Sequence, residues 1–315
     1  MTGQPDAPLD AARASFLERL AARPPVLVVD GHLADPTHPA ISPFDRGFLL
    51  GDGVFDTMRL CAGAPFRLDA HVERLAASAA WLGVLPAVEA ARRARHSIDV
   101  ALEHAAERAI REGSVRTTLT RGPGAPGLAP AADAWPTLTV AIHPRPASAG
   151  HSPPPALSAV VTTTGRRNER SASGAHKTLA YADAIVALAD ARTRGADDAI
   201  FLDTTDALAC GSASNVVLVL RGVLTSPPAG GAVLPGITRS VVLDLAHALG
   251  IPVDERRVDA GELALADELW LTSSIRGIAP VVRLDGRPVG GGAPGPLWHR
   301  LHDAYEAAVQ SGCRA

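Results

Sequence analysis

The residue whose chemistry stands out in this sequence is Lys177, because it is the only lysine in the chain. The chain has 30 basic residues in total, so every other one is an arginine. A guanidinium stays protonated, whereas a lysine amine shifts its pKa readily when it is buried and can form a Schiff base. Keeping one lysine therefore indicates a position that needs a free amine. A second interpretation stays open, in which an arginine-rich and alanine-rich composition leaves one surface lysine by chance.

The segment Leu234–Arg239 has the pattern of an anion-binding site. Its sequence, Leu-Pro-Gly-Ile-Thr-Arg, precedes a predicted helix that ends near Gly250. Thr238 or a neighbour is expected to cap that helix, and the free N–H groups of its first turn point back into a glycine-containing turn. Unpaired amides and the helix dipole both favour an anion such as phosphate. The same pattern also fits an ordinary helix start without a ligand.

Two further segments have glycines or hydroxyl groups where ligands often bind. Glycines at positions 47, 51 and 53 precede a predicted strand over 54–60, and they indicate tight turns or close approach of the backbone. Ser273 and Ser274 follow a predicted strand over 267–272, and ligands collect at the carboxyl ends of strands in α/β folds. An ordinary turn also explains each pattern when it is taken alone.

The order of predicted helices and strands indicates an α/β or α+β fold with two domains. The length of 315 residues and the apolar content of 47% are sufficient for two hydrophobic cores. Between residues 143 and 155 the chain is rich in proline, which is typical of a linker. We therefore expect an N-terminal extension (1–25), a small α/β domain (26–143), an interdomain linker (144–156) and a large domain (157–315). Predicted helices cover 10–22, 69–82 with Asp69 as N-cap, 87–112, 179–194 and 294–310.

The composition argues against several classes of protein. The net charge is −3 and the arginines are scattered, so we expect neither a nucleic-acid partner nor an anionic membrane surface. No apolar stretch approaches the roughly 20 residues of a membrane span, and the N-terminus lacks the pattern of a signal peptide. Cys61, Cys210 and Cys313 are far apart and odd in number, which argues against a disulfide framework and against a cysteine-based metal site. These features predict a cytoplasmic protein with no metal.

Seven short motifs follow one another between Val26 and the C-terminus. They are Asp45–Phe48 with Gly51–Phe55, His71–Leu75, Arg116 with Thr120–Gly122, Lys177–Tyr181, Gly211–Asn215, Leu234–Arg239, and Thr272–Ser274 before Pro280–Val281. In this order they resemble the class IV aminotransferases, the fold-type IV pyridoxal-phosphate enzymes. That family includes branched-chain and D-amino-acid aminotransferases and aminodeoxychorismate lyase. The resemblance implies two α/β domains with the cofactor, pyridoxal 5'-phosphate, at their junction, and a homodimer whose partner loop closes the site.

The resemblance also implies a role for each matching residue. Lys177 would hold the cofactor as a Schiff base and, once substrate displaces it, would move the Cα proton. Tyr181 matches the residue that hydrogen-bonds the phenolic oxygen of the cofactor. Arg74 matches the phosphate-binding arginine, for which a bidentate contact is chemically suited. On the residues alone, Arg74 could equally be a solvated helix arginine and Tyr181 a core residue.

The phosphate group would be bound by two further segments. Ile237 and Thr238 would donate from their backbone amides and a hydroxyl, in the turn that also contains Leu234 and Gly236. Serines at positions 273 and 274 occupy the other phosphate-contact positions of the family. This implied role agrees with the helix-start argument made above for the same segment.

The chain departs from the family pattern at Cys210. The family places a glutamate five residues before the position of Asn215, where its carboxylate keeps the ring nitrogen of the cofactor protonated. A neutral thiol does this poorly. The resemblance therefore leaves three interpretations: transamination with a weaker electron sink, a reaction that needs less delocalisation such as β-elimination, or loss of activity. Cys210 also fits the ordinary interpretation of a small buried apolar residue.

Three arginines are candidates for binding a substrate carboxylate, namely Arg59, Arg116 and Arg276. Arg59 and Arg116 lie on predicted strands, and Arg276 lies in the loop that follows Ser274. Each could also be a surface arginine. The leading hypothesis is a pyridoxal-phosphate-dependent aminotransferase that acts on a small amino acid. The alternatives are a lyase of the aminodeoxychorismate type that releases pyruvate, and a non-catalytic homologue that binds the cofactor.

Overall fold

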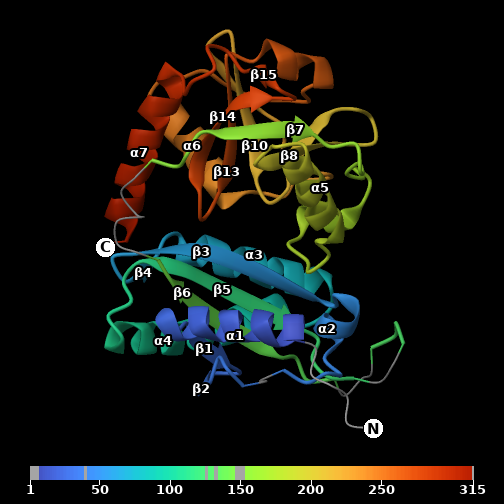
Figure 1. The fold of residues 1–315 in the computed structure, drawn as a ribbon, viewed down its shortest axis with the longest axis vertical. Helices are drawn as coiled ribbons and strands as arrows, with labels where there is room; N and C mark the ends of the chain where they lie inside the picture. Colours follow the sequence, from blue (N-terminus) through green and yellow to red (C-terminus); the bar gives the residue numbers. More distant parts are fainter. Residues whose placement is uncertain (1–6, 39–40, 125–126, 131–133, 146–152, 314–315) are drawn as a thin grey trace.

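Two β-sheets, built from successive parts of the chain, form the centres of two domains (Figure 1). The structure is a computed structural model, and it describes residues 7–38, 41–124, 127–130, 134–145 and 153–313. The prediction of a two-domain fold with mixed helices and strands is confirmed. The two sheets lie one above the other in Figure 1, with α3 beside the boundary between them.

The first domain is an antiparallel sheet with helices on one face. Its strand order is β2-β1-β6-β5-β3-β4. Helix α3 contacts β3, and helix α4 contacts β6 and β1. The strands are β1 Val26–Val29, β2 His32–Ala34, β3 Gly53–Cys61, β4 Ala64–Pro65, β5 Gly113–Thr120 and β6 Leu138–Pro144. The helices are α2 Arg46–Leu50, α3 Leu68–Trp81 and α4 Ala87–Glu107.

Strand β5 explains which side chains of this sheet are available to a ligand. Its residues alternate strictly between buried and half-buried positions. Val115 and Leu119 belong to the core that α3 and α4 cover. Because successive side chains of a strand point to opposite faces, Arg116 lies on the other face of the sheet.

The second domain is a mixed sheet that closes on itself. Its order is β12-β11-β10-β13-β14-β7-β8-β9, β15 pairs with β14, and β9 also pairs with β10. The closing pair is Cys210 with Asn215. The strands are β7 Leu157–Val161, β8 Asp198–Leu202, β9 Leu208–Gly211, β10 Asn215–Leu220, β11 Val223–Ser226, β12 Val253–Glu255, β13 Glu268–Ser273, β14 Gly277–Leu284 and β15 Arg287–Pro288. The helices are η2 Ala172–Ala175, α5 Ala182–Thr193, α6 Ile237–Ala248, η3 Ala260–Leu265 and α7 Pro296–Gly312.

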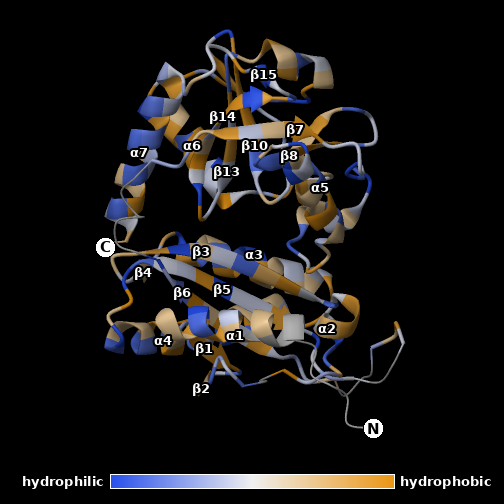
Figure 2. Ribbon diagram, in the orientation of Figure 1, coloured by the Kyte–Doolittle hydropathy of each residue, from blue (hydrophilic) through white to orange (hydrophobic). Residues whose placement is uncertain are grey.

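Apolar packing on both faces of this sheet fixes its shape. One face carries a cluster of leucine, valine and isoleucine side chains, and the other packs against α6 and α7. Figure 2 shows α7 alternating between hydrophilic and hydrophobic positions, as expected of a helix with one buried face. Among the described residues, no helix is long and apolar enough to cross a lipid bilayer.

The helix boundaries correct several of the predicted ones. Helix α3 begins at Leu68 after Arg67, which has a φ of 57°, so Asp69 lies inside the helix and is not its N-cap. Helix α4 ends at Glu107 and not at residue 112, because Ala109 adopts a left-handed φ of 54°. Helix α5 begins at Ala182 and not at residue 179, since the preceding residues pair with β3.

The N-terminal extension and the expected interdomain linker are each described in part. The helix predicted over 10–22 in the N-terminal extension is present as α1, Ala7–Ala22, and residues 1–6 lie outside the described residues. Strand β6 extends to Pro144, within the segment expected to form the interdomain linker. Residues 146–152 of that segment lie outside the described residues.

Candidate active site

The segment that contains Lys177 follows β7 in sequence but pairs with β3 of the first domain. The Phe55 amide donates to the Lys177 carbonyl at 3.0 Å, and the Leu179 amide donates to the Gly53 carbonyl at 3.0 Å. A Cβ at Gly53 would lie 2.8 Å from both the Leu119 carbonyl oxygen and a methyl of Leu179. Glycine is therefore required where this segment approaches β3. The backbone of the only lysine is fixed by contacts between the two domains.

The Lys177 side chain points into a small aromatic and polar group. Its Nζ donates to the Tyr181 hydroxyl at 3.1 Å and lies 4.6 Å from the centre of the Phe55 ring. Tyr181 packs edge-on against the same ring at 5.2 Å. Contacts between an amine cation and an aromatic face are favourable, and they hold the amine in one place.

One face of α3 connects the lysine segment to the expected anion-binding segment. Arg74 and Ser78 are four residues apart, so their side chains lie on the same face of the helix. Ser78 accepts a hydrogen bond from the Lys177 amide at 3.3 Å. Arg74 donates through Nη1 to the Pro235 carbonyl at 2.9 Å. The amine and the Leu234–Arg239 turn are therefore placed by the same helix.

A buried carboxylate orients Arg74. Asp56, on the helix-covered face of β3, is fully buried and accepts from Arg74 Nε and Nη2 at 2.8 Å each. The Nδ1 atom of His71 lies 2.7 Å from the same carboxylate. Burial opposes ionisation of Asp56, but the His71 hydrogen bond and the Arg74 guanidinium outweigh it and hold the pKa of Asp56 well below its usual range. Burial lowers the pKa of His71, although Asp56 opposes this.

The start of α6 is open to a ligand. Gly236 is the N-cap, and no side chain in the described part of the chain makes a capping hydrogen bond there. A Cβ at Gly236 would lie 1.8 Å from the Asn215 side-chain oxygen, so the turn can pass this close only as glycine. Ile237 is half-buried, and Thr238 is buried within that first turn. Amides and a hydroxyl at a helix N-terminus suit an anion.

Asn215 brings the remaining predicted segments together. It pairs with Cys210 on β9 and with Thr272 on β13, so the three residues form a row across three strands. Its side-chain amide donates to the Leu234 carbonyl at 2.9 Å. Ser273 ends β13 next to this row, followed by a turn that starts with residue 274. The Thr272 hydroxyl is buried without a hydrogen-bond partner among the described residues.

Cys210 differs from the other predicted site residues in its surroundings. Its side chain is half-buried, and burial raises the pKa of the thiol, with the nearby Arg167 guanidinium opposing this. The thiol is therefore neutral near pH 7. Arg167 was not singled out from the sequence, where it is one of several arginines in a polar loop.

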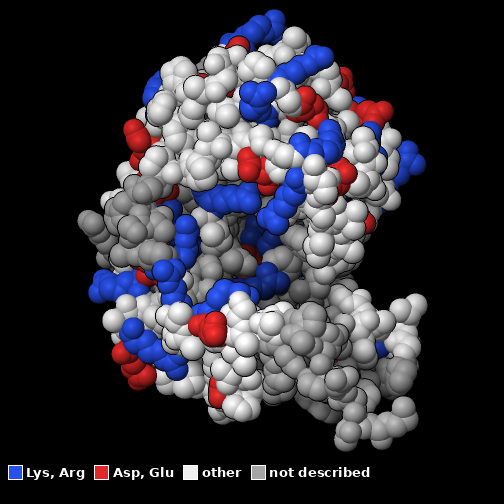
Figure 3. Space-filling model, in the orientation of Figure 1, with Lys and Arg blue, Asp and Glu red and all other residues white. Residues whose placement is uncertain are grey.

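The three candidate substrate arginines have different surroundings. Arg116 stacks on the Phe55 ring, with its guanidinium carbon 3.9 Å from the ring centre, and so shares this ring with Lys177. Burial lowers the pKa of Arg116, and the opposing charge effects come from Tyr181 and Asp56. Figure 3 shows a hollow between the two halves of the molecule, with Lys and Arg side chains around it.

Arg59 and Arg276 are both engaged in ion pairs. Arg59 forms two hydrogen bonds with Glu306 of α7, at 2.8 and 3.0 Å, and so links the domains. Arg276 donates to the buried Asp198 at 2.7 Å. Of the three candidates, Arg116 is the one that contacts the Phe55 ring beside the lysine, and the substrate roles of all three stay predictions.

Comparison with known proteins assigns the family. The family model described as amino-transferase class IV matches residues 53–284. The chain belongs to this family. It is 30% identical over 292 residues to a D-alanine aminotransferase of Listeria monocytogenes, covering 91% of this chain and 97% of the relative. It is 32% identical over 281 residues to a Methanocaldococcus jannaschii protein provisionally named a branched-chain-amino-acid aminotransferase, covering 89% and 95%.

Solved class IV aminotransferases share the fold. The branched-chain amino acid aminotransferase of Escherichia coli superposes with a TM-score of 0.81 at 25% identity, covering 91% of this chain and 95% of that one. A hypothetical aminotransferase from Mycobacterium tuberculosis in its pyridoxal-phosphate-bound form superposes with a TM-score of 0.76 at 28% identity, covering 91% and 99%. The expectation of a two-domain fold of fold-type IV is confirmed.

Class IV aminotransferases use pyridoxal phosphate, and the residues present here fit that group. The uncapped first turn of α6 and the oriented Arg74 guanidinium suit a phosphate dianion. The buried Thr272 hydroxyl without a partner adjoins Ser273 in the same region. The Lys177 amine is a group of the kind that an aldehyde binds.

The structure brings most of the residues predicted from sequence into one region. Contacts join Lys177, Tyr181, Arg74, Arg116 and the two segments that contain Leu234 and Cys210. Sequence reasoning missed the residues that position them, which are Phe55, Asp56, His71, Ser78, Arg167 and Asn215. Three of these, Phe55, His71 and Asn215, lie within the motifs, but their side-chain partners are remote in sequence.

Proposed function

We propose that this class IV aminotransferase carries pyridoxal phosphate as a Schiff base on Lys177 and transfers the amino group of a small amino acid. The observation that carries this proposal is the position of the only lysine. Its amine lies 3.1 Å from the Tyr181 hydroxyl, and its backbone is tied to Ser78 on the helix whose Arg74 reaches the Leu234–Arg239 turn. An amine and an anion-binding turn joined through one helix suit a cofactor that has an aldehyde and a phosphate.

The site residues divide the work between holding the cofactor and moving a proton. When it is bound, pyridoxal phosphate supplies an electron sink for charge that develops at the substrate Cα. Arg74, Ile237, Thr238, Ser273 and Ser274 hold the phosphate. With cofactor and substrate bound, the Lys177 amine would be the group that accepts the Cα proton at Nζ. Tyr181 orients that amine through their hydrogen bond.

Arg116 binds the substrate carboxylate in this proposal. Its guanidinium stacks on the ring that Lys177 Nζ also contacts, and among the described residues it has no carboxylate ion pair. Arg116→Gln should raise KM for amino acids by about tenfold or more, because a charge-assisted hydrogen bond contributes about 1.5–3 kcal/mol. Arg276→Gln is the matched control, since Arg276 already pairs with Asp198. A rise in KM with Arg276→Gln and none with Arg116→Gln would reverse the assignment.

The lysine assignment is tested by the visible absorbance of the purified holoprotein. Pyridoxal phosphate attached to Lys177 should give a yellow protein, and Lys177→Ala should remove the absorbance band that arises from the attachment. Arg166→Ala is a control, because this arginine bonds the Thr162 carbonyl and Asp206, and its hydrogen bonds within the described residues reach none of the site residues. A colour that Lys177→Ala leaves unchanged would contradict the central assignment.

A second function, β-elimination of the aminodeoxychorismate type, is favoured by the neutral thiol of Cys210. A group that leaves from the substrate takes with it the negative charge that develops at Cα. Elimination therefore depends less on protonation of the ring nitrogen than transamination does. Single-turnover spectra distinguish the candidates. Conversion of the bound cofactor to its amine form by a donor amino acid supports transamination, and pyruvate release without that conversion supports elimination. No change with a panel of amino acids supports a non-catalytic homologue.

We also propose a homodimer. The short helix α2 and the residue before its N-cap expose four large apolar side chains, and such a surface is typical of an interaction site. These are Phe44, Phe48, Leu49 and Leu50, with Phe48 76% exposed. Light scattering of the purified protein should give twice the chain mass of 32.5 kDa. Phe48→Glu should shift the protein towards the mass of one chain, and a mass of one chain in the unaltered protein would contradict the proposal.

A further inference from the structure

Arg167 presents a guanidinium near Cys210, the residue at which the family resemblance implies a glutamate. Its guanidinium carbon lies 4.0 Å from the centre of the Phe201 ring. Phe201 on β8 is paired directly with Cys210 on β9, so their side chains lie on the same face of the sheet. The guanidinium also acts on Cys210, because it lowers the pKa of the thiol against the larger effect of burial. The stacking and the strand pairing thus bring Arg167 and Cys210 together.

The backbone on both sides of this guanidinium is fixed. The Arg167 amide donates to the Leu202 carbonyl at 2.9 Å, and the Thr204 amide donates to the Arg167 carbonyl at 3.0 Å. Asp203 forms an isolated bridge with Arg167 and accepts from the Ala207 amide at 2.9 Å. These bonds hold the end of β8 and the turn into β9 in one conformation.

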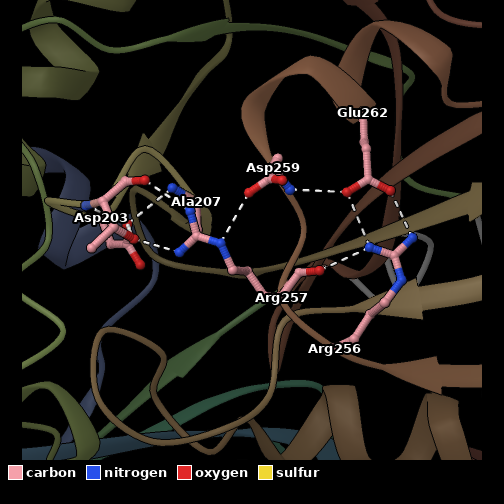
Figure 4. A network of polar contacts seen from close by, with 7 residues as sticks. Asp203, Ala207, Arg256, Arg257, Asp259 and Glu262 are labelled. Atoms are coloured by element: carbon pink, nitrogen blue, oxygen red, sulfur yellow. Dashed lines mark hydrogen bonds and ion pairs between the residues drawn. The ribbon is translucent and has the colours of Figure 1, made fainter.

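A network of ion pairs supports the same turn from its other side (Figure 4). Arg257 donates to the Thr205 carbonyl at 2.8 Å and to Asp259 at 2.9 Å. Asp259 and Glu262 form a capping box on η3, and Glu262 also accepts from Arg256. The turn next to Arg167 is therefore held by hydrogen bonds that need no ligand, which favours a preorganised site.

No carboxylate among the described residues forms an ion pair with Arg167. The acidic residue that affects Cys210 is Asp198, and its oxygens are already used. One accepts from the Ser212 hydroxyl at 2.5 Å, and the other accepts from Arg276 at 2.7 Å. Asn215 pairs with Cys210, and its side-chain amide donates to the Leu234 carbonyl rather than to Arg167 or Cys210. Donors of Arg167 are thus available to a ligand beside Cys210.

We propose that Arg167 binds the ring nitrogen of pyridoxal phosphate by donating a hydrogen bond to it, and so holds this nitrogen unprotonated. The inference rests on the proposed function, which puts residue 210 beside that nitrogen. A guanidinium has five N–H donors and no acceptor, so a nitrogen bound to it must offer its lone pair and cannot keep a proton. The fixed positive charge also disfavours a second positive charge nearby. Arg167 then has the role that a carboxylate has in the family pattern, but with the opposite result. The carboxylate keeps the ring nitrogen protonated, and Arg167 keeps it unprotonated.

The first experiment measures the ring nitrogen in the unaltered holoprotein. Protein loaded with pyridoxal phosphate labelled with ¹⁵N in the ring should give the NMR shift of an unprotonated pyridine across the stable pH range. Cys210→Glu should move the signal to that of a protonated ring. A protonated signal in the unaltered protein would overturn the inference, and this measurement requires no variant to fold.

The second experiment compares binding of pyridoxal phosphate with an analogue that has C–H in place of the ring nitrogen. The unaltered protein should bind the analogue about tenfold more weakly, because a hydrogen bond from a charged donor is lost. Arg167→Gln should weaken binding of the natural cofactor and reduce the difference between the two ligands, while Arg167→Lys restores part of it. Arg166→Gln is the matched control and should change neither ligand. Equal affinities in the unaltered protein would overturn the inference.

These outcomes separate the inference from the proposed function. If the protein binds no pyridoxal phosphate, or if Lys177→Ala leaves the absorbance unchanged, the proposed function fails and the inference fails with it. If the absorbance depends on Lys177 but the ring nitrogen is protonated, only the role of Arg167 is wrong. Thermal unfolding followed by circular dichroism distinguishes a lost contact in Arg167→Gln from a lost fold.

Discussion

Two arginines at opposite ends of the candidate site are held in contrasting ways. Arg74 donates twice to the fully buried carboxylate of Asp56, which His71 also contacts. Arg167 stacks on the Phe201 ring beside the uncharged Cys210 thiol, with no carboxylate ion pair among the described residues. The positive charge of Arg74 is balanced by the Asp56 carboxylate. The positive charge of Arg167 is not balanced by a carboxylate of the described residues, so it can act on a bound ligand.

The contrast follows from what each end is expected to bind. A phosphate is negatively charged and attracts a guanidinium even when some of its N–H groups are already bonded. Arg74 can therefore donate two hydrogen bonds to Asp56, which fix its orientation. A pyridine nitrogen is neutral or positive, so any charge beside it decides which form is bound. An aromatic ring and rigid backbone orient Arg167 without adding a negative charge. The comparison shows that the orientation of an arginine and the net charge around it can be set by different neighbours.

The largest effect is expected at the phosphate end. Asp56→Asn removes one partner of a buried pair, and such changes typically destabilise a protein by about 3–5 kcal/mol. Affinity for pyridoxal phosphate should fall as well, because Arg74 loses its orientation. Denaturant unfolding and cofactor titration measure the two effects. The control is Glu89→Gln, which breaks an exposed pair with Arg92 and should leave stability nearly unchanged.

The pH dependence of stability sharpens the same comparison. The pKa of Asp56 is lowered in the folded protein, so its contribution is fully present above the unfolded value of about 3.9 and is lost as pH falls towards the folded pKa. The difference in unfolding free energy between the unaltered protein and Asp56→Asn should therefore not shrink between pH 7 and about 5, where loss of Asp56 also lowers the pKa of His71 further, and it should shrink below about 4. A difference that shrinks between pH 7 and 6 would contradict the assignment of this effect to Asp56.

An intermediate effect is expected from making the two ends alike. Cys210→Glu places a carboxylate beside Arg167, as Asp56 lies beside Arg74, and it restores the family residue behind the ring. Transamination in single-turnover assays should speed up by about tenfold, which corresponds to about 1.4 kcal/mol in the barrier. Cys210→Gln is the neutral control of the same size and should give no increase. An equal gain in both variants would show that size and not charge matters at this position.

The smallest effect is expected between the two ends, at the lysine. Tyr181→Phe keeps the edge-on packing against Phe55 but removes the hydrogen bond to Lys177 Nζ. The rate should fall by about fivefold, since one hydrogen bond is typically worth about 1 kcal/mol. The pH at which the visible absorbance changes should also move. A rate change without any shift in that pH would indicate a structural role for the tyrosine.

The sequence contained most of the residues that meet in the site, but few of the reasons why they meet. Lys177 was evident from its rarity, and the Leu234–Arg239 turn was evident from the sequence of a helix start. Local signals of this kind depend on neighbours in the chain. Asp56 looked like any strand residue, because its partners come from a helix that begins twelve residues later.

The remaining misses also have physical causes. Arg167 could not be distinguished from the other arginines of its loop until β8 and β9 were paired and Phe201 lay under its guanidinium. The pairing of Arg59 with Glu306 joins residues 247 positions apart. Helix α5 starts later than its composition suggested because Lys177 and Leu179 are held by β3. Long-range pairing overrode local preference in each case.

The attachment of the Lys177 segment to β3 has a consequence for how the enzyme is made. The lysine is fixed by strands that leave the ribosome early, whereas Ser273 and the α7 helix that pairs with Arg59 are synthesised near the end. A chain that ends before Ser273 holds the amine but lacks part of the proposed phosphate site. Cofactor uptake through all of these residues is then a late event in synthesis, and the yellow colour of a cell extract would report long or finished molecules rather than total chains.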